Sequence, residues 1–208
     1  MISPGEPSAS RTAAGDAKAV LRARLLARRR ARPAAQRAAG SEAVSAALLR
    51  LPEAGRVACV AAYAAVGSEP SVDAALDALA ARGVRVLLPV LQKGLDVEWA
   101  ERPAAGAGLV ASAVRPRLRE PAGPSLGTAA VAEAGLVVAP ALAVGRDGTR
   151  LGRGGGSYDR ALRRVAPGAL VVAVVWADEL LDTVPTEPHD ASVGAVATPD
   201  GVLRLPAT

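Results

Sequence analysis

The chain has 208 residues, a formal charge of +5 and an isoelectric point near 10.3, and half of its residues are hydrophobic. This length predicts one domain with a core of ordinary size, and the single cysteine, Cys59, excludes an internal disulfide. No apolar run reaches the roughly 18 residues that span a bilayer, and residues 1–15 lack the hydrophobic centre of a secretory signal. We therefore expect a cytoplasmic protein with no membrane partner.

The excess of basic residues is also typical of nucleic-acid-binding proteins, but the composition disfavours nucleic acid as a partner. Only 2% of the chain is aromatic, so few side chains could stack on bases. Successive arginines at 28–32 and at 37 follow polar helix faces, where arginine is normally solvated. We expect this basic surface to attract small anionic ligands instead.

The N-terminal part of the chain predicts a tail followed by two helices. Residues 1–15 are small and polar, which predicts a disordered tail ahead of one domain at residues 16–208. Asp16 is expected to cap a helix that stops near Pro33, where a second helix begins and continues to Arg50.

Strands and helices alternate over the rest of the chain. We predict buried strands at 56–63, 84–89, 95–100, 135–139 and 170–176, helices at 71–82 and 158–165, and a long loop at 101–128. The strands are rich in valine, alanine and leucine throughout, which indicates burial on both faces and hence parallel pairing. The predicted fold class is α/β, with a three-layer, doubly wound and mostly parallel sheet in a single domain.

A glycine-rich segment at 145–160 is the strongest functional signal. It is predicted to join the strand ending at Ala139 to the helix starting near Tyr158. Its glycines allow successive N–H groups to turn toward a phosphate, Arg150 and Arg153 add cationic forks, and Asp159 adds an oxygen ligand for magnesium. It is neither a Walker A loop nor a dinucleotide fingerprint. The alternative is a tight turn with solvated arginines.

Residues 150–160 resemble the Arg-Leu-Gly-x-Gly-Gly-Gly-Tyr-Tyr-Asp-Arg motif of the 5-formyltetrahydrofolate cyclo-ligases, with Ser157 in place of the first tyrosine. The resemblance continues at Lys18 and Arg22, at Glu69 after Tyr63, and in two further segments, 118–121 (Leu-Arg-Glu-Pro) and 185–190 (Pro-Thr-Glu-Pro-His-Asp). It extends over residues 16–198, nearly the whole chain. It implies ATP-dependent conversion of 5-formyltetrahydrofolate to 5,10-methenyltetrahydrofolate, with ADP and phosphate released.

The resemblance also implies a role for each matching residue. Lys18 and Arg153 are expected to act on the transferring phosphoryl group, and Asp159 and Asp190 to hold Mg²⁺. Folate is expected to contact Glu69, Arg153, Ser157 and Tyr158. Because Ser157 lacks an aromatic face, we also expect Trp99 or Trp176, which are not part of the resemblance, to stack on the pterin. The residues expected to bind the co-substrate ATP are Lys18, Arg22, Arg150, Leu151, Gly152, Arg153, Gly154, Gly155, Gly156, Ser157 and Tyr158. A monomer is expected.

Other interpretations of the same residues remain open. Lys18 and Arg22 could form a solvated helix face, Asp159 could cap its helix, and Tyr158 could be a core aromatic residue. The chain could also be a catalytically reduced relative that binds nucleotide or RNA, or an enzyme of sugar phosphates or coenzyme A. Folate-dependent ATP hydrolysis would distinguish the cyclo-ligase from both, whereas a steep salt dependence of RNA affinity would favour the binding module.

Overall fold

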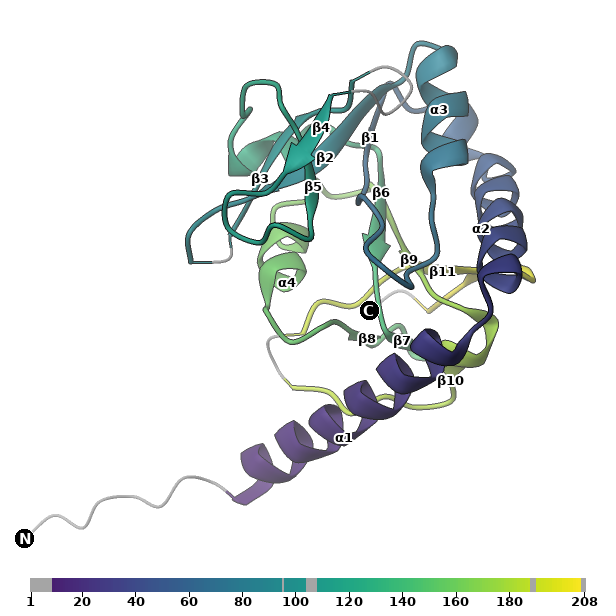
Figure 1. Ribbon diagram of the computed structural model, residues 1–208, viewed down its shortest axis with the longest axis vertical. Helices are drawn as coiled ribbons and strands as arrows, with labels where there is room; N and C mark the ends of the chain where they lie inside the picture. Colours follow the sequence, from purple (N-terminus) through teal and green to yellow (C-terminus); the bar gives the residue numbers. More distant parts are fainter. Residues whose placement is uncertain (1–8, 95, 104–107, 188–189, 207–208) are drawn as a thin grey trace, which may run out of the picture.

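A mostly parallel β-sheet lies at the centre of the computed structural model, which describes residues 9–94, 96–103, 108–187 and 190–206, with side chains from residue 13 (Figure 1). Within these residues seven strands pair in the order β12-β11-β9-β6-β1-β2-β3, and the edge strands β12 and β3 are antiparallel to their neighbours. Their bounds are β1 Cys59–Ala61, β2 Arg85–Leu91, β3 Val97–Glu101, β6 Leu136–Pro140, β9 Leu170–Val174, β11 Ala195–Thr198 and β12 Gly201–Arg204.

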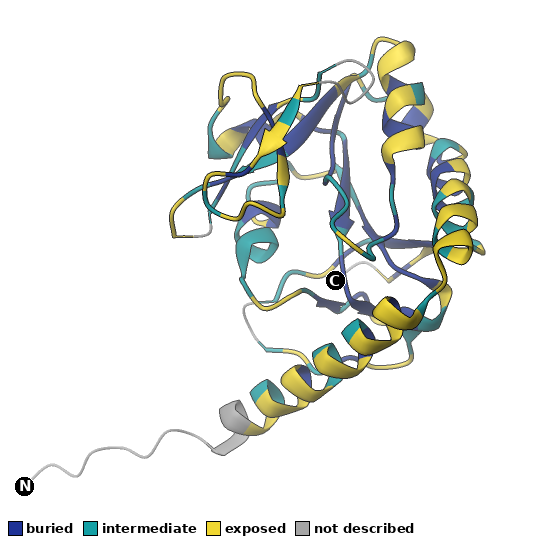
Figure 2. Ribbon diagram, viewed as in Figure 1, coloured by how far each residue is buried: buried dark blue, intermediate teal, exposed yellow. Residues whose placement is uncertain are grey.

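Helices cover both faces of this sheet, so the predicted three-layer α/β fold is confirmed. Helices α2 (Ala34–Leu49) and α3 (Asp73–Ala81) lie on one face, where Leu48 and Leu76 pack with Val138. The 3₁₀ helix η3 (Thr128–Glu133) and α4 (Ser157–Leu162) lie on the other, where Val131 and Leu162 pack with Val137. Neighbouring residues of β6 thus enter opposite cores, which explains the uninterrupted apolar strands. Figure 2 shows this buried centre and the exposed outer sides of the helices.

The long first helix, α1 (Ala9–Ala31), packs against a small second sheet. That sheet joins β10 (Leu180–Leu181), β7 (Ala143–Gly145) and β8 (Arg150–Leu151) in this order within the described part of the chain. Leu25 of α1 is fully buried in a cluster with Leu142 and Leu151. Because β7 and β8 come between β6 and the glycines, the prediction that the glycine-rich segment joins the central strand directly to a helix is wrong. Strands of two or three residues are too short to show a periodicity.

The start of α1 also differs from the prediction. The helix includes residues 9–15, which we expected in a disordered tail, and no acidic residue lies in its first turn, so Asp16 is not the cap. Alanine and arginine favour helix without a cap, and packing against the second sheet holds the later turns. Residues 1–8 lie outside the described residues. Among the helices of the described ranges, none is long and apolar enough to cross a bilayer.

A hairpin lies within the segment that we predicted as one long loop. Its strands, β4 (Leu109–Ala111) and β5 (Arg119–Pro121), pair antiparallel, and β5 packs beside β2. The backbone N–H of Leu91 donates to Oε1 of Glu120 at 2.8 Å, which ties the hairpin to the end of β2. Two further 3₁₀ turns of the described residues are η1 (Glu53–Gly55) and η4 (Ala177–Glu179).

Candidate active site

The carboxyl ends of the central strands open onto a pocket of about 1060 Å³. Its walls include Ala64 beyond β1, Leu91 of β2 and Pro140 of β6, and α1 contributes Lys18 and Arg22. An open parallel sheet normally binds its ligands at this end. Apart from the two tryptophans considered for pterin stacking, the residues that the sequence assigned to ATP, to the folate or to magnesium all line this pocket: Lys18, Arg22, Glu69, Arg150, Leu151, Gly152, Arg153, Gly154, Gly155, Gly156, Ser157, Tyr158, Asp159 and Asp190. His189 lies outside the described residues.

The glycine loop, residues 152–156, has the backbone freedom that the sequence predicted. Gly154 and Gly156 adopt φ of 95° and 65°, conformations that other residues rarely take. Nε of Arg22 donates to the carbonyl of Gly152 at 3.0 Å, and a Cβ at position 154 would lie 3.5 Å from the Arg22 guanidinium carbon. The loop is therefore held against α1 by one of the cations that we assigned to phosphate.

Cations and carboxylates of the pocket pair with one another. Lys18 lies 2.6 Å from Asp190, Arg150 contacts Asp159, and Nε of Arg153 lies 2.9 Å from Glu69. The sequence assigned these cations to phosphate and these carboxylates to magnesium or folate, because their distance along the chain gave no sign of pairing. In this structure each carboxylate has a basic partner from the same set of predicted residues.

Lys18 is the centre of the pocket cluster, which we define as Lys18, Glu187 and Asp190. Its ammonium group is 2.6 Å from Oε2 of Glu187 and 2.6 Å from Oδ2 of Asp190, and only 3% of the side chain is exposed. The backbone N–H of Glu187 also donates to Asp190 at 2.8 Å. The interpretation of Lys18 as part of a solvated face is therefore wrong. Glu187 received no role from the sequence, although it precedes Asp190 by three residues in the same motif.

Asp159 is held by two elements at once. Its Oδ1 accepts hydrogen bonds from Arg150, on β8, and from the backbone N–H of Ala191 at 3.3 Å. The N-cap of α4, Gly156, has no side-chain cap, so capping does not explain Asp159. The hydrogen bond to Ala191 joins the first turn of α4 to the loop that carries Asp190.

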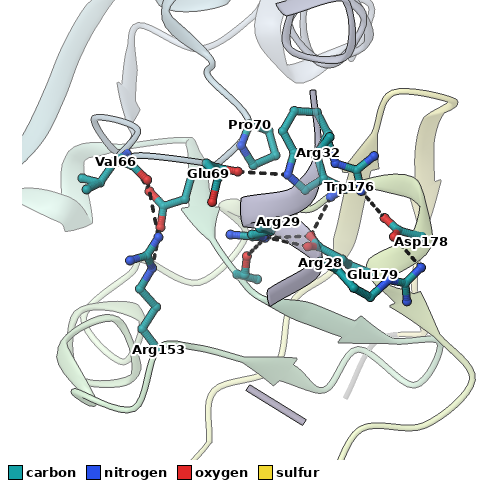
Figure 3. Close-up of polar contacts among 12 residues, drawn as sticks. Arg28, Arg29, Arg32, Val66, Glu69, Pro70, Arg153, Trp176, Asp178 and Glu179 are labelled. Atoms are coloured by element: carbon teal, nitrogen blue, oxygen red, sulfur yellow. Dashed lines mark hydrogen bonds and ion pairs between the residues drawn. The ribbon is translucent and has the colours of Figure 1, made fainter. Parts of the chain in front are cut away.

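Arg153 and Glu69 point toward each other and form an ion pair, as Figure 3 shows. Arg153 also donates to the carbonyl of Val66 at 3.4 Å, while the N–H of Val66 donates to Glu69 at 2.9 Å. The Arg153 side chain is 45% exposed and that of Glu69 only 9%. The pair therefore links the glycine loop to the loop after β1 at the edge of the pocket that faces solvent.

The two tryptophans of the chain occupy different positions from those expected. Trp99 and Trp176 are 0% and 1% exposed and do not line the pocket, so the prediction that one of them stacks on the pterin is wrong. Tyr158 does line it, and its hydroxyl is buried without a hydrogen-bond partner among the described residues. Burial, with a smaller contribution from Glu69, raises the pKa of the Tyr158 hydroxyl well above its usual range.

A second group of charges lies further along α1. We define the inner cluster as Arg29, Glu179 and the groups that they bind. Arg29 is fully buried and donates from Nε and Nη2 to the two oxygens of Glu179, both at 2.7 Å, and from Nη2 to the carbonyl of Ala141 at 2.6 Å (Figure 3). Burial raises the pKa of Glu179 even beside this arginine. The expectation that all arginines of this run are solvated is therefore wrong for Arg29.

Trp176 connects the inner cluster to the loop after β1 that carries Glu69. Its backbone N–H donates to Glu179 at 2.8 Å, and its indole N–H donates to the carbonyl of Ser68 at 3.1 Å. The guanidinium of Arg32 lies 4.8 Å from the centre of the indole ring and also pairs with Asp178 (Figure 3). The buried Trp176 side chain therefore holds the loop that carries Glu69 in place, through its hydrogen bond to Ser68.

The carboxylates of the pocket allow only a small protein contribution to a magnesium site. In the described ranges no three His, Cys, Asp or Glu side chains are grouped so as to hold a metal ion. The hydrogen bonds of Asp159 to described residues fall on Oδ1 alone. Because Mg²⁺ is commonly held by one or two carboxylates together with phosphate oxygens and water, this arrangement fits an ion that arrives with a nucleotide.

Comparisons with known proteins agree with the resemblance seen in the sequence. Residues 14–199 match the 5-formyltetrahydrofolate cyclo-ligase family. The 5-formyltetrahydrofolate cyclo-ligase of Mycolicibacterium smegmatis is 46% identical over 195 residues, which cover 90% of this chain and 97% of that protein.

Solved structures share the fold. The NMR structure of Aquifex aeolicus 5,10-methenyltetrahydrofolate synthetase matches with a TM-score of 0.76 and 24% identity, covering 92% of this chain and 94% of that one. The synthetase of Mycoplasma pneumoniae matches with a TM-score of 0.69 and 16% identity, covering 88% and 98%.

Proposed function

This chain belongs to the 5-formyltetrahydrofolate cyclo-ligase family, and we propose that its pocket binds ATP beside α1 and the glycine loop, with the folate next to it. The reaction is the ATP-dependent conversion of 5-formyltetrahydrofolate to 5,10-methenyltetrahydrofolate. One observation carries the assignment of the site: α1, the glycine loop and the segment around Asp190 meet at a single pocket, although they lie far apart in the sequence.

The proposed chemistry has two steps. The formyl oxygen attacks the γ-phosphorus of ATP, so that an O–P bond forms while the bond to the bridging oxygen breaks and ADP leaves. N10 then attacks the carbon of the phosphorylated imidate, phosphate leaves with the oxygen, and the proton of N10 is lost. Such chemistry depends on positioning and charge neutralisation rather than on a protein nucleophile.

Lys18 and Arg153 are the residues that we assign to the transferring phosphoryl group, with Arg22 and Arg150 on the other phosphate oxygens. Carboxylates of the pocket bind three of these cations. Binding of a triphosphate would therefore exchange one anion for another at Lys18 and at Arg153. Such an exchange avoids leaving a cation buried without a partner.

We assign Mg²⁺ to Asp159 and Asp190. When bound, the ion would neutralise charge on the phosphates of ATP. Asp159 is the stronger candidate, because its hydrogen bonds to described residues use only one of its two oxygens. Glu69, Arg153, Ser157 and Tyr158 are assigned to the folate, and Ser157 is half-buried at the start of α4. We further propose that the protein is a cytoplasmic monomer.

The test of the proposed function is turnover. Incubation with 5-formyltetrahydrofolate, ATP and magnesium should produce the methenyl chromophore, together with one ADP for each folate converted. A protein that binds ATP but forms neither product would support the alternative of a catalytically reduced relative. The family and the pocket do not favour that alternative, since the residues of the motif are present apart from the change to Ser157.

A further inference from the structure

One wall of the pocket is apolar and has no role in the proposed binding of phosphate. Leu91 of β2 and Val97 of β3 belong to a buried cluster against which Val114, Leu118 and Tyr158 pack. All five residues line the pocket, and Val114 and Leu118 come from the β4–β5 hairpin. A wall of this kind suits a flat ring system rather than a phosphate chain.

Glu120 brings a carboxylate to this apolar wall. It is 7% exposed, lines the pocket, and accepts a hydrogen bond from the N–H of Leu91 at 2.8 Å. Among the described residues Glu120 has no ion pair, whereas the other four carboxylates of the pocket each have a basic partner. Those four are Glu69, Asp159, Glu187 and Asp190.

A buried carboxylate without a cation is costly unless hydrogen-bond donors surround it. One backbone N–H satisfies only part of the capacity of a carboxylate, which has about four acceptor positions. The buried Tyr158 hydroxyl on the same wall also has no partner in the part of the chain that the structure describes. The apolar wall therefore offers two polar groups for a ligand, and at Glu120 the ligand must supply donors.

We propose that Glu120 binds the pterin ring of the folate through the ring's 2-amino group and N3–H, with the ring packed against Leu91, Leu118 and Tyr158. This assignment rests on the proposed function. The 2-amino and N3–H groups are two adjacent donors on one edge of the ring, and a carboxylate can accept both. Glu120 thereby selects the pterin, while the cations that we assigned to phosphate bind the nucleotide.

Steady-state kinetics of Glu120→Gln test this assignment. Glutamine keeps the shape but exchanges an acceptor for a donor, which opposes the donors of the pterin. We expect the KM for 5-formyltetrahydrofolate to rise about 10- to 100-fold, while kcat and the KM for ATP stay within about twofold. Glu101→Gln is the matched control, because Glu101 lies on the neighbouring strand β3 but outside the pocket, with 60% of its side chain exposed.

A folate analogue makes the test specific for the ring edge. In 2-desamino-5-formyltetrahydrofolate a hydrogen replaces the 2-amino group. The parent protein should bind the analogue about 10-fold more weakly than the normal substrate, and Glu120→Gln should bind the two equally. Equal discrimination by the parent and the variant would overturn the assignment, as would a loss of kcat at unchanged KM for the folate.

Two further outcomes are distinguishable. If the parent protein does not convert 5-formyltetrahydrofolate at all, the proposed function fails; if it does and Glu120→Gln behaves like the control, only the role of Glu120 fails. Should the glutamine variant not fold, Glu120→Asp is compared with the parent protein in the same assay. Aspartate keeps the charge, but its shorter side chain moves the carboxylate away from the pterin. A folate KM for that variant equal to the parent's would then overturn the assignment.

Discussion

The inner cluster and the pocket cluster are built on the same face of α1 but have different surroundings. Lys18 and Arg29 are 11 positions, or about three helical turns, apart, so their side chains point in the same direction. Arg29 and Glu179 are 0% and 1% exposed in their side chains, whereas Glu187 and Asp190 beside Lys18 are 21% and 12% exposed. A ligand therefore cannot reach Arg29 and Glu179, whereas it can reach the ion pairs of Lys18.

This difference separates two uses of buried charge. The inner cluster joins α1 to the end of β9, and Trp176 extends this connection to the Ser68 carbonyl. Its hydrogen bonds therefore stabilise the fold. The pocket cluster also pairs a cation with carboxylates, and under the proposed function phosphate would replace those carboxylates at Lys18. We therefore expect substitutions in the first to lower stability and substitutions in the second to lower activity.

The largest effect is expected for Arg29→Met. Methionine fills a similar volume but leaves the Glu179 carboxylate buried without its cation, which should lower the free energy of unfolding by about 3–5 kcal/mol. Urea denaturation measures this change. Arg28→Met is the control, because the Arg28 side chain is 49% exposed and pairs with Asp178 at the surface. An equal loss of unfolding free energy in the two variants would contradict the structural role that we assign to the inner cluster.

Lys18→Met should act mainly on ATP use. Loss of one charge-assisted contact to phosphate is expected to reduce kcat/KM for ATP by about 10- to 150-fold, or about 1.5–3 kcal/mol. Stability should fall less than for Arg29→Met, because water can reach Glu187 and Asp190. The two measurements together are decisive: a large loss of stability with unchanged ATP kinetics would make the pocket cluster a second architectural pair.

Asp159→Asn tests whether a pocket carboxylate also serves the metal. Asparagine can still accept the hydrogen bond from Ala191 but is a weaker ligand for Mg²⁺, so the magnesium concentration for half-maximal rate should rise by about 10-fold. Turnover should fall as well, and Asp190→Asn should show a milder change. Magnesium titration curves that superimpose on the parent's would leave Asp159 as a partner of Arg150 only.

The smallest effect is expected at a partly exposed pair outside both clusters. The Arg164 guanidinium lowers the pKa of Asp96 to about 2, and both side chains are 33% exposed. A lowered pKa means that the pair stabilises the protein above the ordinary value of 3.8 and that this contribution is lost as the pH falls toward 2. Because water screens the pair, we expect less than about 1 kcal/mol.

Asp96→Asn should remove this pH dependence. The parent should be slightly more stable than the variant at pH 5, and the difference should vanish near pH 2, as followed by denaturation at both values. A difference that persists at pH 2 would mean that Asp96 acts through packing and not through its charge.

The sequence predicted the central strands and the fold class well, since apolar runs such as residues 135–139 report burial directly. It was less informative where an element is short: β7 and β8, with three and two residues, carry no periodicity. The strands β11 and β12 were also missed. Each has only four residues, and the turn at Pro199 and Asp200 lies between them. Runs this short, next to turn residues, could not be distinguished from a loop.

At the site, residue types were predicted but their partners were not. The glycine loop and its cations could be identified because they are close in sequence, whereas the pairing of Arg150 with Asp159, of Arg153 with Glu69 and of Lys18 with Asp190 depends on tertiary contacts. The burial of Arg29 could not be predicted either. Its place within a run of arginines indicated a solvated face, and its partner Glu179 lies 150 positions away in the chain.

The contact of Lys18 with Glu187 and Asp190 spans 169 and 172 positions of the chain, which has a consequence for synthesis. Helix α1 is therefore translated well before the acidic partners of both Lys18 and Arg29. Until then Lys18 and Arg29 lack the acidic partners that they have in the folded protein. The pocket is therefore completed only after the segment that carries Glu187 and Asp190 has been made.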